Sequence, residues 1–137
     1  MFKTIVVGTN WSDSADLAFA RALELARSSG AALHVVTAHD PNPTPVVGGP
    51  APPAAGPDFQ ADVALERTLE RLGAQDVEVH QHTSTAEPGQ AILEIAAQVG
   101  ADLIVVGNKG MHRRVLGSIP NTVSHRAECD VLIVQTS

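Results

Sequence analysis

Cysteines and long apolar runs are scarce in this chain of 137 residues, and each scarcity excludes a class of protein. Cys129 is the single cysteine, so an internal disulfide framework is excluded and a reducing compartment is favoured. No run approaches the ~18 consecutive apolar residues of a membrane span. No long apolar segment precedes the first strand-like run at residues 4–7, as one would in a secretory signal. We therefore expect a cytoplasmic protein that makes no membrane contact.

Aromatic side chains and positive charge are also scarce. Aromatics make up 3% of the residues and hydrophobic residues 44%, so Ala, Val, Leu and Ile must build the core. The formal net charge of −6 argues against a protein that binds nucleic acids or anionic membranes in general. The length fits one domain over residues 1–137, which could bury about two-thirds of its unfolded surface. A small molecule is the expected partner.

Strand-like and helix-like segments alternate along the chain. Strands are expected at residues 4–9, 33–38, 76–83, 103–106 and 131–135, and helices at residues 13–28, 58–72, 88–99 and 118–127. This alternation predicts an α/β fold, a doubly wound and Rossmann-like parallel sheet of five strands with helices on both faces. Residues 41–57 hold seven of the nine prolines, which predicts a flexible surface excursion inside the one domain.

The expected strand at residues 103–106 leads into a loop marked by glycines. This strand is apolar throughout, as in a parallel sheet covered on both faces, and Gly107 is expected to end it. Gly107 and Gly110 tolerate a positive φ and allow a ligand close to the backbone, so their N–H groups could point at a phosphate. The glycine spacing, which ends at Gly117 and Ser118, favours an anion-binding loop over an ordinary turn.

A helix is expected to begin directly after this loop. Ser118 is a preferred N-cap residue, and Pro120 is tolerated in a first helical turn. The amides of Ile119 and its neighbours would carry the positive end of the helix dipole. Further positive charge comes from Lys109, Arg113 and Arg114. The Gly-Lys-Ser/Thr ending of a Walker loop is absent, as is a Gly-x-Gly-x-x-Gly fingerprint after the first strand.

The carboxyl ends of the first and fourth strands are the expected ligand site. In doubly wound sheets, ligands bind outside the carboxyl ends of the strands, where the winding reverses. If these two strands are neighbours, Thr9 and Asn10 meet Gly107 and Asn108 in one crevice. The sequence therefore predicts an anion site at this crevice.

These residues resemble the universal stress protein family over essentially the whole chain. The motifs that carry the resemblance are VVGT at residues 6–9, SDS at 12–14, DLIVVGNKG at 102–110, GSIP at 117–120 and CDVLIV at 129–134. The resemblance implies the strand order 3-2-1-4-5 and a stress-response regulator. It also implies a homodimer joined through the last strand, over Val131, Leu132, Ile133 and Val134. In one branch of the family the glycine loop holds ATP, and some related proteins hold cyclic AMP.

The resemblance also implies which residues surround an adenine nucleotide. Gly8, Thr9 and Asn10 would line the adenosine side, and Ala38 at the end of the second strand would touch the base. Ribose and phosphates would be surrounded by Val106, Gly107, Asn108, Gly110, Gly117, Ser118 and Ile119. No catalytic residue is implied, so any ATPase activity would be weak.

This chain departs from the family pattern in three places, and each would affect how the outer phosphates or the base of a nucleotide is held. Six residues, 111–116, separate Gly110 from Gly117, where the family usually has nine. Asn10 replaces the usual aspartate, and an amide lacks the charge that helps to hold a divalent ion such as magnesium. Trp11 replaces a small residue and could cover the base or block it. ATP, AMP and cyclic AMP therefore all stay open as ligands.

Other functions compete with nucleotide binding. A dimeric adaptor that binds no nucleotide and acts through protein contacts is the main alternative. The signatures of PP-loop pyrophosphatases and of serine hydrolases with a Gly-x-Ser-x-Gly elbow are absent. His80 and His82 lie two apart on one strand face and resemble a metal pair. No third ligand has a recognisable spacing, so we expect exposed polar side chains on an edge strand and no metal site.

Overall fold

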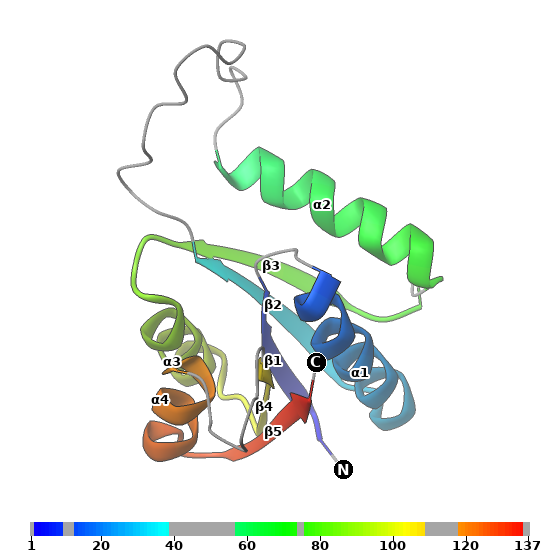
Figure 1. The fold of residues 1–137 in the computed structure, drawn as a ribbon. Coiled ribbons are helices and arrows are strands. Elements are labelled where there is room, and N and C mark those ends of the chain that lie inside the picture. Colours follow the sequence, from blue (N-terminus) through cyan, green and yellow to red (C-terminus); the bar gives the residue numbers. More distant parts are fainter. Residues whose placement is uncertain (1, 10–12, 39–56, 74–75, 109–117, 136–137) are drawn as a thin grey trace, which may run out of the picture.

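The molecule is built around a five-stranded parallel sheet with helices on both faces (Figure 1). The computed structural model describes residues 2–9, 13–38, 57–73, 76–108 and 118–135. The strands are β1 (Thr4–Gly8), β2 (Ala32–Ala38), β3 (Val79–Ser84), β4 (Leu103–Asn108) and β5 (Asp130–Gln135). Their order is β3-β2-β1-β4-β5, and every neighbouring pair is parallel. The predicted fold class and strand order are both confirmed.

Four helices cover the two faces of the sheet. They are α1 (Asp13–Ser29), α2 (Pro57–Leu72), α3 (Pro88–Val99) and α4 (Ser118–Arg126). Figure 1 shows α1 and α2 on one face and α3 and α4 on the other. Gly100 ends α3 in the left-handed conformation at φ 66°, and its N–H donates to Ala96 O. None of the helices in these described ranges combines the length and the apolar character that crossing a bilayer requires.

Each face of the sheet has its own hydrophobic core. Side chains alternate between the two faces along each strand, so Ile5 and Val7 point to one core and Val6 to the other. Phe19 of α1 is the largest fully buried side chain of the first core, and Ile92 of α3 belongs to the second. Because the central strands are buried on both faces, their sequences are continuous apolar runs rather than alternating ones.

Some boundaries differ from the expected ones. β4 does not end at Gly107, because Gly107 and Asn108 still pair with Val134 and Gln135 of β5. β3 begins at Val79 rather than at residue 76, and the preceding segment instead contacts α1. Of the proline-rich segment at residues 41–57, only Pro57 lies in the described ranges, where it opens α2.

Candidate functional site

The predicted site lies at the carboxyl ends of β1 and β4. These two strands are neighbours, with Ile5 paired to Leu103 and Val7 paired to Val105. The chain winds from β1 outward through β2 to β3, and then returns to β4 and β5 on the other side of β1. The reversal of the winding therefore falls between β1 and β4, where doubly wound sheets bind their ligands.

Two polar residues are buried at this reversal. Thr9, directly after β1, is 8% exposed, and Asn108, the last residue of β4, is fully buried. The backbone N–H of Thr9 donates to Val36 O at 3.0 Å, which fixes the chain just beyond β1. Each of these residues therefore brings a buried polar side chain to the carboxyl ends of β1 and β4. Of the predicted crevice residues, Thr9, Gly107 and Asn108 are thus placed at one edge of the sheet.

Gly8 is required by packing. A Cβ added at this position would collide with Cδ1 of Ile92 and would lie 3.0 Å from its Cγ1. Ile92 is 3% exposed in the core beneath α3, so its side chain has little space to move away. The absence of a side chain at Gly8 therefore allows α3 to lie close to the end of β1, independently of any ligand.

Helix α4 leads into β5, which runs parallel to β4, so the helix begins towards the carboxyl ends of the strands. Ser118 is exposed, Ile119 is half-buried against the second core and Pro120 is buried. The helix begins at Ser118, as expected, and the role of Ser118 as N-cap stays a prediction because the residue before it lies outside the described ranges. The first-turn amides have no partner within the helix and form the positive end of the helix dipole. Ser118 and Ile119 can thus address an anion through their backbone.

The remaining predicted residues divide into two groups. Ala38 is half-buried at the end of β2, where it pairs with Ser84 of β3. Val106 is 1% exposed and its side chain belongs to the second core, so only its backbone is available to a ligand. The others lie outside the described residues; they are Asn10, Gly110 and Gly117, with the neighbouring Trp11, Lys109, Arg113 and Arg114.

Asp102 is a structurally important residue whose contacts the sequence pattern did not reveal. Its carboxylate accepts hydrogen bonds from the amides of Lys3, at 2.8 Å, and Thr4, at 3.1 Å. Burial raises the pKa of this carboxyl, but the hydrogen bonds from the two amides outweigh that effect and hold the pKa below its ordinary value of 3.8. Asp102 thus ties the start of β4 to the start of β1, at the end of the sheet opposite the predicted site.

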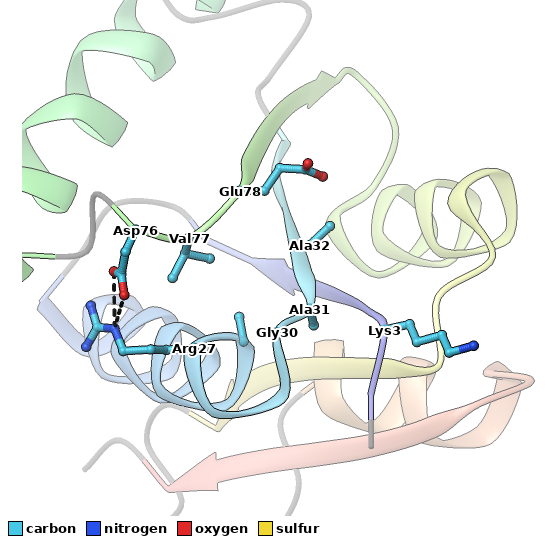
Figure 2. Close-up of a pocket in the computed structure, with 9 residues that line it drawn as sticks. Lys3, Arg27, Gly30, Ala31, Ala32, Asp76, Val77 and Glu78 are labelled. Atoms are coloured by element: carbon cyan, nitrogen blue, oxygen red, sulfur yellow. Dashed lines mark hydrogen bonds and ion pairs between the residues drawn. The ribbon is translucent and has the colours of Figure 1, made fainter.

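A cleft of about 380 Å³ also lies at this opposite end, at the amino ends of the strands (Figure 2). Lys3, Ala31 and Glu78 line it, just before or at the starts of β1, β2 and β3. Arg27 of α1 forms an ion pair with Asp76 at 3.2 Å across one side of the cleft, and this hydrogen bond lowers the pKa of Asp76. The described residues that line the cleft carry both signs of charge and include no helix N-terminus, so they do not fit an anion site.

Cys129 precedes β5 and is half-buried. Burial raises the pKa of its thiol, and the neighbouring carboxylates of Asp130 and Asp102 raise it further. The thiol therefore stays protonated at neutral pH, and a protonated thiol is a poor nucleophile. This agrees with a structural role for the residue.

Comparison with known proteins identifies the family. The model of the universal stress protein family matches residues 1–135. A universal stress protein of Mycobacterium tuberculosis (strain H37Rv) is 34% identical over 146 aligned residues, covering 99% of this chain and 98% of the relative. A universal stress protein of Thermus aquaticus is 35% identical over 147 aligned residues, covering 98% of this chain and 100% of the relative. A crystal structure of a universal stress protein in complex with cAMP superposes with a TM-score of 0.76 at 36% identity, covering 99% and 98%. The chain belongs to the universal stress protein family.

Proposed function

We propose that this protein binds an adenine nucleotide at the carboxyl ends of β1 and β4. The observation that carries the proposal is the 36% identical universal stress protein whose crystal structure holds cAMP, since the two chains superpose over 99% of this one. The geometry supports the same ligand class. Thr9 and Asn108 are polar and buried at the reversal of the winding, and α4 begins at Ser118 with first-turn amides that have no partner within the helix.

A nucleotide with one phosphate, such as AMP or cAMP, fits this chain at least as well as ATP. The loop that would enclose the outer phosphates has six residues, 111–116, and Asn10 lacks the charge that would favour a magnesium-bound triphosphate. The start of α4 can still address the nearer phosphate. Each hydrogen bond to a charged group contributes roughly 1.5 to 3 kcal/mol. Two such bonds with help from the base approach the ~8 kcal/mol of micromolar binding.

Two measurements test the ligand class. Mass spectrometry of protein denatured directly after purification should detect an adenine nucleotide. Calorimetric titration with cAMP, AMP and ATP, each with and without magnesium, should give affinities within about tenfold of each other, or 1.4 kcal/mol. ATP binding that is about a hundredfold tighter and requires magnesium would refute the preference for one phosphate. Absence of binding by all three nucleotides would refute the nucleotide function and favour the dimeric adaptor.

A matched pair of serine variants on α4 tests the position of the phosphate. Ser118 lies in the first turn of the helix, and Ser124 lies one to two turns later with its hydroxyl donating to Asn121 O at 3.2 Å. Ser118→Ala should weaken cAMP binding about fivefold, since one hydrogen bond contributes about 1 kcal/mol. Ser124→Ala should bind cAMP as the wild type does. Equal affinities for both variants would move the phosphate away from α4.

We also propose a homodimer formed through β5. This strand is an edge of the described sheet, and Val131, Leu132, Ile133 and Val134 are only half-buried there. An exposed apolar edge strand favours pairing with another chain. Sedimentation at tens of micromolar protein should show a dimer, and Ile133→Asp should shift it to monomer while the far-UV spectrum stays folded. A wild-type monomer at that concentration contradicts the proposal.

A further inference from the structure

Three histidines meet on the α3/α4 face of the sheet. His34 of β2 is paired in register with His80 of the edge strand β3, and His82 lies two residues further along β3 on the same face. His34 and His80 are stacked with ring centroids 4.8 Å apart, and His34 and His82 with centroids 5.1 Å apart. His80 and His82 formed only a pair in the sequence. The register between β2 and β3 supplies His34 as the third ring.

Two of these rings already bring nitrogen atoms together. Nδ1 of His34 lies 2.8 Å from Nε2 of His82, so in the neutral pair one nitrogen donates its proton and the other accepts it. Two nitrogens bound at about 2.0–2.1 Å to one tetrahedral zinc ion lie about 3.3 Å apart. If these two nitrogens moved apart by about half an ångström, they could both bind one ion instead of sharing a proton.

His80 has the arrangement of a supported metal ligand. Its Nε2 lies 2.9 Å from the Glu78 carboxylate, which leaves Nδ1 as the other ring nitrogen. Metal-ligating histidines regularly donate one ring N–H to a carboxylate, which orients the ring and makes the second nitrogen a better ligand. Figure 2 shows the carboxyl group of Glu78 directed away from the Arg27–Asp76 pair, so Glu78 is not engaged there. The side chain of His80 is 49% exposed and has room to turn towards its neighbours.

We propose that His34, His80 and His82 bind a divalent transition metal ion that prefers imidazole, with zinc as the probe and Glu78 as the orienting carboxylate. With the side chains as they stand, no group of three His, Cys, Asp or Glu residues among the described residues could hold a metal ion, this cluster included. The ion therefore enters by turning His80 and by displacing the proton between His34 and His82, which moves through solvent to the other nitrogen of the ring that carried it, so that both rings bind as neutral imidazoles. The remaining coordination position is taken by water.

The protonation state of the cluster suits this ion. Burial lowers the pKa of His34, and the neighbouring His82 and His80 lower it further, while Glu78 acts in the opposite direction. Burial and His80 lower the pKa of His82. A lowered pKa favours the neutral ring, and neutral imidazole is the form that binds metal. Because the ligands come from two strands, a bound ion would also tie the edge strand β3 to β2 and stabilise the folded chain.

Calorimetric titration with zinc chloride tests the proposal on full-length protein that carries no histidine tag and has been treated with chelator. The wild type should bind one zinc ion, and its melting temperature should rise with zinc. His34→Gln, His80→Gln and His82→Gln should each weaken binding at least tenfold, because loss of a supporting partner alone costs about 10–100-fold. Glu78→Gln should weaken it by about tenfold. His125→Gln, at an exposed histidine on α4, is the matched control and should leave the affinity unchanged.

A measurement on the wild type removes any dependence on how the variants fold. Zinc should shift the imidazole NMR signals of His34, His80 and His82, and leave those of His125 in place. Shifts confined to His39 or His112, which lie outside the described residues, would overturn the proposal. It would also be overturned by failure of the wild type to bind zinc, or by wild-type affinity in the His34 and His82 variants.

Discussion

The two ends of the parallel sheet use their polar groups differently. At the amino end, Asp102 accepts hydrogen bonds from the amides of Lys3 and Thr4, and Arg27 is paired with Asp76. At the carboxyl end, buried polar residues stand beside the first turn of a helix. The amino ends of the strands therefore contribute to stability, whereas their carboxyl ends form the proposed binding site. Changes at the amino end should affect stability alone, whereas changes at the carboxyl end should affect stability and ligand affinity together.

The largest effect is expected at Gly8, at the carboxyl end. Gly8→Ala places a Cβ against Cδ1 of the buried Ile92 side chain, so α3 must move or Ile92 must change its rotamer. Overpacking of this kind costs about 1–3 kcal/mol of the free energy of unfolding. Urea denaturation measures the loss, and cAMP titration of the same variant should show weakened binding because Gly8 lies beside the proposed site.

A double mutant sharpens the interpretation of Gly8. Ile92→Val removes the Cδ1 atom that the new Cβ would meet, so the destabilisation by Gly8→Ala should be smaller in that background. The coupling free energy between contacting residues is typically about 0.5–3 kcal/mol. Additive effects of the two substitutions would show that the contact with Ile92 does not explain the glycine.

A smaller effect is expected at Asp102, at the amino end. Asp102→Ala removes the carboxylate that holds the amides of Lys3 and Thr4. Water can replace part of these contacts because the Lys3 hydrogen bond is exposed, so we expect a loss of about 1 kcal/mol in the free energy of unfolding. The affinity for cAMP should stay within about twofold of the wild type, as for distant independent sites. A larger change in affinity would show that the amino end of the sheet also affects ligand binding.

The pH dependence at Asp102 follows from its lowered pKa. The folded state binds a proton on this carboxyl less readily than the unfolded state does, because the amide hydrogen bonds favour the charged form. The stabilisation is therefore complete above the ordinary pKa of 3.8 and is lost as the pH falls through the lower folded value. The stability difference between wild type and Asp102→Asn should shrink as urea denaturation is repeated from about pH 6 to about pH 3. A constant difference would exclude this carboxylate as its cause.

The smallest effect is expected at the Arg27–Asp76 pair beside the amino-end cleft. Both side chains are largely exposed, at 43% and 61%, and exposed ion pairs contribute little to stability because water screens the charges. Arg27→Ala should lower the free energy of unfolding only slightly and leave cAMP affinity unchanged. Addition of salt should reduce the difference from the wild type. Weakened cAMP binding in this variant would indicate that the ligand binds at the amino ends of the strands, which contradicts the proposed site.

Much of the fold could be predicted because local patterns follow the environment of each strand. The run at residues 103–106 is apolar throughout since β4 is covered on both faces, and the alternation of strands and helices predicted the parallel sheet. The strand order was implied by the family resemblance and is confirmed. The expected end of β4 at Gly107 was wrong, because pairing with β5 carries the strand on to Asn108.

The candidate site could be predicted only in part. The neighbouring ends of β1 and β4 bring Thr9, Gly107 and Asn108 to one edge as expected. Helix α4 begins at Ser118 as expected, and the N-cap role of Ser118 stays a prediction because the preceding residue lies outside the described ranges. The contacts of Asp102 could not be predicted, since its partners Lys3 and Thr4 are 99 and 98 residues away in the chain. Hydrogen bonds over such separations leave no periodic signal.

The sequence by itself determined the class of fold, the apolar central strands and the family. These features are written in short-range patterns of hydrophobicity and turn residues, which act within a few residues of one another. Only the tertiary structure decided that Gly8 must accommodate Ile92 and that His34 stands beside His80 and His82. Such contacts depend on the register of strands and on how closely a helix approaches the sheet, and both are set by packing between segments far apart in the chain.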